Sequence, residues 1–288
     1  MAIRHVMVAG GGVMGSQVAW QTAWHGFDVT IYDAFDAGLD RCRDLLDAHG
    51  QTFIDQRSAT TAEVQAARAR IALTTDLAAA AGDADLVIEQ VPEDMDIKRD
   101  FWRRASAAVG PDALLVTNTS SLLPSEIVDA VSGPERFLSL HFCVPVWDAN
   151  IGEVMAQPST TDEAYEAIAH FAADIGLVPV RLRKEWPGYV LNALLIPFLL
   201  AGIDLVRNDV ADPAAIDQVW QICNKSEIGP CQMVDMVGMN VAYHIAKGQG
   251  EVTGDQNLLD IAAYLKSDFI DQGRLGIESG RGFYDYAS

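Results

Sequence analysis

The 288-residue sequence has few cysteines and no long hydrophobic segment. The four cysteines show no paired spacing, and no Cys/His cluster suggests zinc, so we expect free thiols in a reducing cytoplasm and no metal site. The longest apolar stretch, 189–203, is broken by polar and helix-disrupting residues and is shorter than the ~20 residues that span a bilayer. It predicts a buried helix and not a membrane segment.

Basic side chains are also scarce. Forty Asp and Glu against 20 Lys and Arg leave a formal net charge of −20, which repels nucleic-acid phosphates and anionic membrane surfaces. Neither is an expected partner. The N-terminal residues carry too short an apolar stretch for a signal peptide, which favours a cytoplasmic location. Half of the residues are hydrophobic, enough for a sizeable core, and the length favours two domains or one large one.

The first half alternates short apolar runs with longer helical patterns, which is typical of βαβ units around a parallel sheet. Between the second and third strands, leucine and alanine at helical spacing predict a helical hairpin over 36–68 with a polar break at 56–61. A helix is predicted over 162–175. The predicted strands are 4–9, 28–32, 70–74, 86–89, 114–117, 137–141 and 177–182.

The pattern changes near residue 185, and only helical periodicity follows. We therefore predict an α/β fold: a Rossmann-type doubly wound sheet with a helical-hairpin insertion over 1–184, then an all-α domain over 185–288. The predicted helices of the second domain are 189–208, 213–225, 230–247 and 258–272.

A glycine-rich loop follows the first predicted strand and opens a helix, with the pattern GxGxxG at Gly10, Gly12 and Gly15. The first glycine permits a tight turn, the second lets backbone N–H groups approach a pyrophosphate, and the third allows close packing of helix on strand. The strand, loop and helix in this order predict a dinucleotide site, with the pyrophosphate on the helix N-terminus. The alternative is an ordinary glycine-rich turn.

Asp33 stands at the end of the second predicted strand, 23 residues after Gly10. A carboxylate there accepts hydrogen bonds from the adenosine ribose hydroxyls and repels a 2′-phosphate. The next residues, Ala34 and Phe35, supply no arginine to reverse that choice. The sequence therefore favours NAD over NADP.

Polar side chains at the ends of later strands form a second candidate constellation. Because carboxyl ends of parallel strands line one crevice, Asn118, Ser120 and His141 are expected to converge there. Histidine can accept a hydroxyl proton near neutral pH, and Glu153, twelve residues on, could orient the ring. From spacing alone, a structural histidine, a helix-starting Ser120 and a solvent-facing Glu153 remain alternatives.

These segments together resemble the L-3-hydroxyacyl-CoA dehydrogenase family over nearly the whole chain. The glycine loop carries Val13 and Met14 as the family does, and the remaining matches are DLVIE at 85–89, NTSSL at 118–122, LHF at 140–142, EV at 153–154, GYVLN at 188–192, IGP at 228–230 and GRGFYDY at 280–286. The resemblance implies a Rossmann-like domain, a helical domain that dimerises, and NAD-linked oxidation of a (3S)-3-hydroxyacyl thioester to the 3-oxoacyl form in fatty acid metabolism.

The resemblance also implies roles for individual residues. His141 matches the catalytic histidine and Glu153 the acid that pairs with it, while Ser120 and Asn192 match polar groups around the reacting oxygen. The residues that match the cofactor site are Gly10, Gly12, Val13, Met14, Gly15, Asp33, Glu93, Lys98 and Asn118.

Two departures from the family bear on the substrate. Val144 stands where the family has a substrate-contacting asparagine, and valine can neither donate nor accept a hydrogen bond. The insertion 36–68, which is lysine-rich in the family and meets the CoA phosphates, has no lysine here. Free CoA, a polyanion, becomes less favoured, and a carrier-bound thioester or a small hydroxy acid more so.

Three functions are therefore compared. The first is an NAD-dependent 3-hydroxyacyl thioester dehydrogenase, and the second is a dehydrogenase of a free 3-hydroxy acid, or of a carrier-bound 3-hydroxyacyl group, on the same fold. The third is a catalytically silent NAD-binding protein. The complete set of Ser120, His141, Glu153 and Asn192 argues against the third, because a binding module would not need it.

Overall fold

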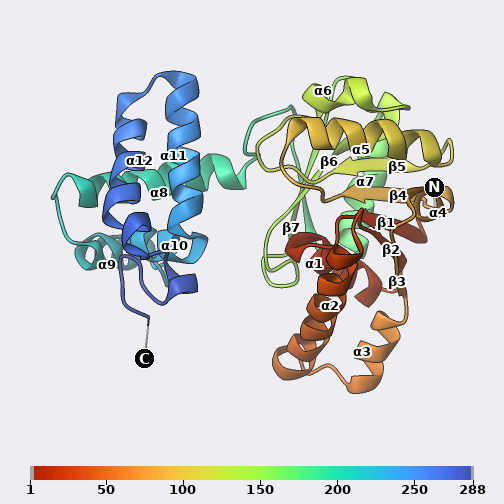
Figure 1. Cartoon of the computed structure of the whole chain (residues 1–288), viewed down its shortest axis with the longest axis horizontal. Coiled ribbons are helices and arrows are strands. Elements are labelled where there is room, and N and C mark those ends of the chain that lie inside the picture. The colour runs from red at the N-terminus through yellow and green to blue at the C-terminus, as the bar shows by residue number, and fades with distance from the viewer. Residues whose placement is uncertain (1–2, 287–288) are drawn as a thin grey trace. The chain divides into compact units, whose positions relative to one another are not determined.

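The computed structural model describes residues 3–286 and divides into two compact units, the first ending at Val190 and the second beginning at Leu191 (Figure 1). Each unit has its own core and is described by itself.

The first unit is built on an eight-stranded sheet in the order β3-β2-β1-β4-β5-β6-β7-β8. Strands β1 to β6 are all parallel, and their order 3-2-1-4-5-6 is that of the doubly wound dinucleotide-binding fold. The predicted fold class is confirmed. The strands are β1 (His5–Ala9), β2 (Asp28–Tyr32), β3 (Ile71–Thr74), β4 (Leu86–Glu89), β5 (Leu114–Thr117), β6 (Phe137–Phe142), β7 (Ile151–Ala156) and β8 (Val178–Arg181).

Helices cover both faces of this sheet. Along β1, Val6 and Val8 point into one core with Trp20, while Met7 and Ala9 point into the other with Trp102. Side chains of α1 (Val13–Trp24), α2 (Asp36–Arg57), α3 (Thr61–Arg68) and α7 (Asp162–Asp174) fill the first core. Those of α4 (Leu77–Gly82), α5 (Met95–Ala108), α6 (Pro124–Ile127) and the 3₁₀ turn η1 (Val128–Ala130) fill the second, and a further 3₁₀ turn, η2 (Pro134–Arg136), precedes β6.

One strand was not predicted as such. Residues 151–156 form β7, which pairs antiparallel with β6 and parallel with β8. Gly152 and Glu153 interrupt its apolar pattern, so it lacks the continuous hydrophobic run that marks the other buried strands. The helical hairpin predicted over 36–68 is present as α2 and α3, and Thr60 and Glu63 form a capping box where α3 begins.

The second unit is all helical. Its helices are α8 (Leu191–Arg207), α9 (Pro213–Asn224), α10 (Pro230–Val237), α11 (Met239–Thr253) and α12 (Gln256–Asp268), followed by the 3₁₀ turns η3 (Ile270–Gln272) and η4 (Ile277–Ser279). The prediction of a single helix over 230–247 is wrong, because Gly238 adopts φ +97° and separates α10 from α11. Buried Asp235 accepts hydrogen bonds from Phe283 N, Tyr284 N and the Tyr286 hydroxyl, which fasten the C-terminal segment.

The division at residue 190 falls six residues after the boundary expected at residue 184. Residues 185–190 belong with the first unit because they bond to it: the Glu185 carboxylate accepts from Ser125 N at 2.8 Å, and Val190 N donates to Glu153 Oε1 at 2.8 Å.

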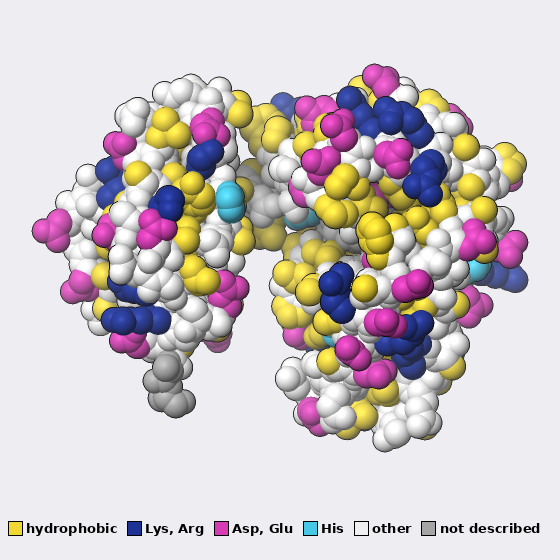
Figure 2. Space-filling model, in the orientation of Figure 1, with side chains coloured by type: hydrophobic (Ala, Val, Ile, Leu, Met, Phe, Trp, Pro, Cys, Tyr) yellow, Lys and Arg dark blue, Asp and Glu magenta, His cyan; other side chains and the backbone are white. Residues whose placement is uncertain are grey.

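Acidic side chains are scattered over the visible face of both units, interspersed with Lys and Arg (Figure 2). Within residues 3–286, no helix has both the length and the apolar character needed to cross a membrane.

Candidate active site

The glycine loop between β1 and α1 has the backbone that its sequence predicts. Gly10 adopts φ +113°, and a Cβ there would lie 2.6 Å from the Gln90 carbonyl oxygen. A Cβ on Gly15 would collide with the carbonyl oxygen of Gly10. By contrast, Gly12 at the N-terminus of α1 faces open space, and no side chain of residues 3–286 caps this helix. The helix N-terminus is therefore free to receive a phosphate group.

Asp33 is fixed just beyond β2 by two backbone donors. Gly11 N donates to its Oδ2 at 2.9 Å and Phe35 N to its Oδ1 at 3.1 Å, so both oxygens keep a free lone pair. The carboxylate thus stands beside the glycine loop and can accept from two ribose hydroxyls. Together with the open N-terminus of α1, this arrangement fits the adenosine and pyrophosphate portions of NAD.

Lys98, expected at the cofactor site, is fully buried between two carboxylates. Its Nζ lies 2.7 Å from Glu89 Oε1 and 3.3 Å from Glu93 Oε2. Glu89, at the end of β4, also accepts from Val91 N, the Trp102 indole and the Thr117 hydroxyl. Burial raises the pKa of Glu89, and the Lys98 ammonium opposes that effect. A direct contact of Lys98 with NAD stays a prediction.

Glu93 holds the loop that carries Ser120. Its Oε1 accepts from Ser120 N and Ser121 N, each at 3.0 Å, and from the hydroxyls of Thr119 and Ser121. Burial would raise its pKa, but these hydrogen bonds and Lys98 outweigh burial and lower it. The carboxylate is therefore ionised and half-exposed, available on one side to a ligand.

Asn118, just beyond β5, is fixed by two neighbours. Its amide Nδ2 donates to Gln90 Oε1 at 2.6 Å, and its Oδ1 accepts from Phe142 N at 3.1 Å. Asn118 therefore ties the ends of β4, β5 and β6 together, beside the glycine loop that Gln90 also contacts. Its role toward the cofactor stays a prediction.

His141 and Glu153 lie together in the sheet. Nδ1 of His141 is 2.8 Å from Glu153 Oε2, and both side chains are almost fully buried. Because a carboxylate only accepts, Nδ1 carries the proton and Nε2 of the neutral ring is left as an acceptor. Ser120 Oγ lies 3.1 Å from that Nε2. The structure thus brings Ser120, His141 and Glu153 into one hydrogen-bonded row.

The sequence pattern did not predict two contacts of the row formed by Ser120, His141 and Glu153. Tyr189 stacks on His141, and Val190 N donates to Glu153 Oε1 at 2.8 Å. The GYVLN segment marked both residues, but nothing in its pattern indicates what they touch. Glu89 was also missed, although a charged residue closing the apolar strand DLVIE was a usable signal.

The residues after β6 carry no competing chemistry. Burial, reinforced by the charge of Glu153, raises the pKa of Cys143 to about 11, so it is not a thiolate nucleophile. Val144 is 54% exposed, so position 144 is accessible to a ligand. Asn192 is the second residue of α8 in the second unit, and its part in the site stays a prediction.

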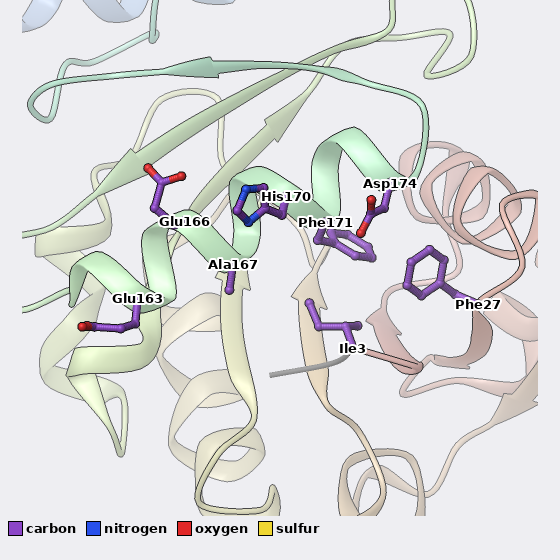
Figure 3. A pocket seen from close by; sticks show the side chains of 8 residues that line it. All are labelled: Ile3, Phe27, Glu163, Glu166, Ala167, His170, Phe171 and Asp174. Carbon is purple, nitrogen blue, oxygen red and sulfur yellow. The ribbon is translucent and has the colours of Figure 1, made fainter.

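A separate cavity of about 480 Å³ lies against α7, where Glu163, Glu166, His170 and Asp174 line one side and Ile3 and Phe27 the other (Figure 3). Glu166 is already paired with Arg181 at 2.8 Å. None of the residues expected at the active site lines this cavity.

Comparison with known families identifies the protein family of the chain that has both the glycine loop with Asp33 and the row of Ser120, His141 and Glu153. The model of the 3-hydroxyacyl-CoA dehydrogenase NAD-binding domain matches residues 5–186, and that of the C-terminal domain matches residues 188–286. The chain belongs to the 3-hydroxyacyl-CoA dehydrogenase family. It is an NAD-dependent oxidoreductase of that family, as expected from the glycine loop and Asp33.

Individual relatives within the family span the whole chain. A probable 3-hydroxybutyryl-CoA dehydrogenase of Bacillus subtilis is 32% identical over 99% of this chain and 98% of its own length. The solved (S)-3-hydroxybutyryl-CoA dehydrogenase of Ralstonia eutropha is 26% identical with a TM-score of 0.89, covering both chains fully. A solved diketoreductase that acts on dicarbonyl compounds is 40% identical with a TM-score of 0.94, over 99% of this chain and all of its own.

Proposed function

We propose that the chain interconverts a (3S)-3-hydroxyacyl thioester and its 3-oxoacyl form, with His141 as general base and Glu153 as the group that orients it. The hydrogen-bonded row of Ser120, His141 and Glu153 carries this proposal. Family membership supports the reaction class, and the fixed Asp33 and open N-terminus of α1 support NAD.

The proton path follows from the hydrogen bonds. Nε2 of neutral His141 accepts the proton of the substrate hydroxyl, and the imidazolium that forms keeps its Nδ1 proton directed at Glu153. Ser120 Oγ lies 3.1 Å from Nε2, so its hydroxyl can rotate and donate to a substrate oxygen that approaches Nε2. NAD, held at the glycine loop and Asp33, would supply the acceptor for the hydride of C3. In the reverse direction His141 returns the proton.

A second substrate class is favoured by particular residues. Val144 cannot hydrogen-bond to a thioester carbonyl, and α2 with α3 carries no lysine for CoA phosphates. The diketoreductase, the most similar of the three relatives described above, acts on dicarbonyl compounds. A free 3-hydroxy acid, a related dicarbonyl or a carrier-bound 3-hydroxyacyl group is therefore the second candidate, with the same residues performing the chemistry.

Initial rates separate the two classes. NADH formation is measured with 3-hydroxybutyryl-CoA, longer 3-hydroxyacyl-CoAs, acyl-carrier thioesters and free 3-hydroxy acids. We expect the highest kcat/KM on a CoA thioester. A value at least about tenfold higher on free acids or on acyl-carrier thioesters would replace the first candidate by the second.

We further propose that the chain is a cytoplasmic homodimer built through the second unit and acting in fatty acid metabolism. Several large apolar side chains of this unit are exposed, on α8, α9 and α10, and a dimer interface would cover them. They are Leu194, Val219, Ile222 and Met236, at 59–71% exposure. We also propose the first unit, up to Val190, as the NAD-binding domain and the second unit, from Leu191, as the substrate and dimerisation domain.

A further inference from the structure

Tyr189 covers one face of the His141 imidazole. The two ring centroids are 4.5 Å apart and the ring planes meet at 14°, which is a stacked arrangement. Tyr189 is 1% exposed, so water has little access to this contact. Glu153 and Ser120 engage the two nitrogens at the edge of the imidazole, and Tyr189 restrains its face. The imidazole is thus held in direction and in plane.

The backbone around Tyr189 is unusual in a way that serves this contact. Tyr189 adopts φ +55°, a left-handed conformation that is uncommon outside glycine, and Gly188 before it adopts φ +79°. The same turn directs Val190 N to Glu153 Oε1 at 2.8 Å. One short segment therefore contacts both members of the proton-transfer pair, and strained backbone of this kind concentrates at functional sites.

We propose that Tyr189 is a positioning residue for the His141–Glu153 pair: its ring fixes the imidazole plane and stabilises the imidazolium formed when the substrate proton arrives. This proposal rests on the proposed function. An aromatic face carries negative charge density, and its attraction for a cation is strongest where water is excluded. This attraction stabilises His141 only when the ring is protonated, so it favours proton transfer from the substrate hydroxyl to Nε2.

The hydroxyl of Tyr189 has no part in this role. It is buried beside the Ser139 hydroxyl, neither of the two makes a hydrogen bond of good geometry among the described residues, and burial raises the pKa of Tyr189, so it keeps its proton. Removing it while keeping the ring is therefore a matched control. Tyr189→Phe should retain the stack, and losing an unsatisfied buried hydroxyl should cost little stability.

The test compares Tyr189→Phe with Tyr189→Leu and Tyr189→Met, which fill similar space without an aromatic face. We expect the Leu and Met variants to lower kcat roughly tenfold or more, with a much smaller change in KM. Their NADH dissociation constant should be unchanged, which also shows that the first unit is folded. The Phe variant should retain most of the kcat.

The pH profile separates this role from simple packing. Glu153 on β7 bonds to the imidazole, and the charges of Glu93, Glu153 and Glu89 act on Tyr189. Burial keeps both Tyr189 and Cys143, which lies near Glu153, protonated at neutral pH. Without the aromatic face the imidazolium is less stable, so the acidic limb of kcat/KM should move to lower pH by about 0.5–1 unit in the Leu and Met variants. In Tyr189→Phe the limb should stay in place.

A measurement on the unmodified chain needs no variant at Tyr189. In NMR spectra of the chain with ¹³C-labelled histidine, the His141 signal is the one lost in His141→Gln. The stacked Tyr189 ring should shift the ring protons of His141 upfield. An unshifted His141 signal would overturn the proposal. So would an unchanged kcat and an unchanged acidic limb in Tyr189→Leu, or a kcat in Tyr189→Phe as low as that in Tyr189→Leu. Failure of the proposed function is distinct, because His141→Gln would then be fully active.

Discussion

His141 and Glu153 are directly opposite each other in the antiparallel ladder between β6 and β7. Opposed residues of such a pair point to the same face of the sheet, so the backbone itself brings the imidazole and the carboxylate together. On either side, Leu140 pairs with Val154 and Phe142 with Gly152. The 2.8 Å contact between Nδ1 and Oε2 therefore depends on strand register, and slippage by one residue would place the two side chains on opposite faces.

Asp33 should determine the choice of cofactor. Replacing it in Asp33→Ser with Ala34→Arg removes the ribose acceptor and supplies a charge for a 2′-phosphate. Hydrogen bonds to a charged group contribute about 1.5–3 kcal/mol, so kcat/KM for NAD should fall roughly 10- to 100-fold and that for NADP should rise. Equal kcat/KM for the two cofactors in the unmodified chain would contradict this assignment.

Lys98 should be a major determinant of stability. Lys98→Met leaves Glu89 buried without its counter-ion, which should lower the free energy of unfolding by about 3–5 kcal/mol in urea titrations. The matched control is Lys247→Met, since Lys247 pairs with Glu251 on the exposed face of α11. That change should cost far less, because water screens an exposed pair. Equal decreases in the free energy of unfolding of the two variants would show that the buried pair contributes no more to stability than the exposed pair.

The cost of Lys98→Met should depend on pH. Burial raises the pKa of Glu89, and the variant lacks the ammonium that opposes this rise. When folding raises the pKa of a carboxyl group, the free energy of unfolding of the protein decreases as pH increases toward that raised pKa. The difference from the unmodified chain should therefore be larger at about pH 8 than at about pH 5. A constant difference would show that Glu89 does not titrate in this range.

Val144→Asn tests the substrate class. An exposed asparagine at this position can hydrogen-bond to a thioester carbonyl, which valine cannot. If the site accepts acyl-CoA, kcat/KM on 3-hydroxybutyryl-CoA should rise by about 3- to 10-fold, the value of one neutral hydrogen bond. Val144→Thr, which is close to valine in shape, is the comparison. No gain on CoA thioesters, with a loss on free acids, would favour the second substrate class.

Much of the first unit could be predicted because its strands are buried on both faces. The apolar runs 86–88 and 114–116 are the direct signature of such strands, and the predicted limits 86–89 and 114–117 match β4 and β5. The glycine loop was equally predictable, since Gly10 and Gly15 occupy positions that a side chain cannot fill.

Contacts that depend on tertiary packing could not be predicted. The spacing of His141 and Glu153 does not reveal an antiparallel pair, because the strand that carries Glu153 has no regular apolar pattern. Lys98 lies in a helix with charged neighbours, so its sequence resembles a solvent-exposed face although the side chain is fully buried. The stack of Tyr189 on His141 depends on a left-handed turn at a residue that seldom adopts one.

The second unit should form the dimer interface. Leu194→Asp with Ile222→Asp places charges on exposed apolar positions and should convert the dimer to a monomer near 31.2 kDa by light scattering. Val178→Asp, at an exposed apolar position of the first unit, is the control and should leave the mass unchanged. A 31.2 kDa species for the unmodified chain at micromolar concentration would contradict the dimer itself.

Glu153 should act only through His141. Glu153→Gln keeps the shape and removes the charge that stabilises the imidazolium, so kcat should fall. The combined variant His141→Gln with Glu153→Gln should be far less damaging than the product of the two single effects, because the pair acts as one unit. Strictly multiplicative losses would show that the two side chains act independently.

The most direct test of the account is the kcat of His141→Gln on the best substrate, measured beside its NADH dissociation constant. If Nε2 accepts the substrate proton, kcat should fall roughly 10²- to 10⁴-fold while NADH binding stays nearly unchanged. Full activity in His141→Gln would contradict the mechanism.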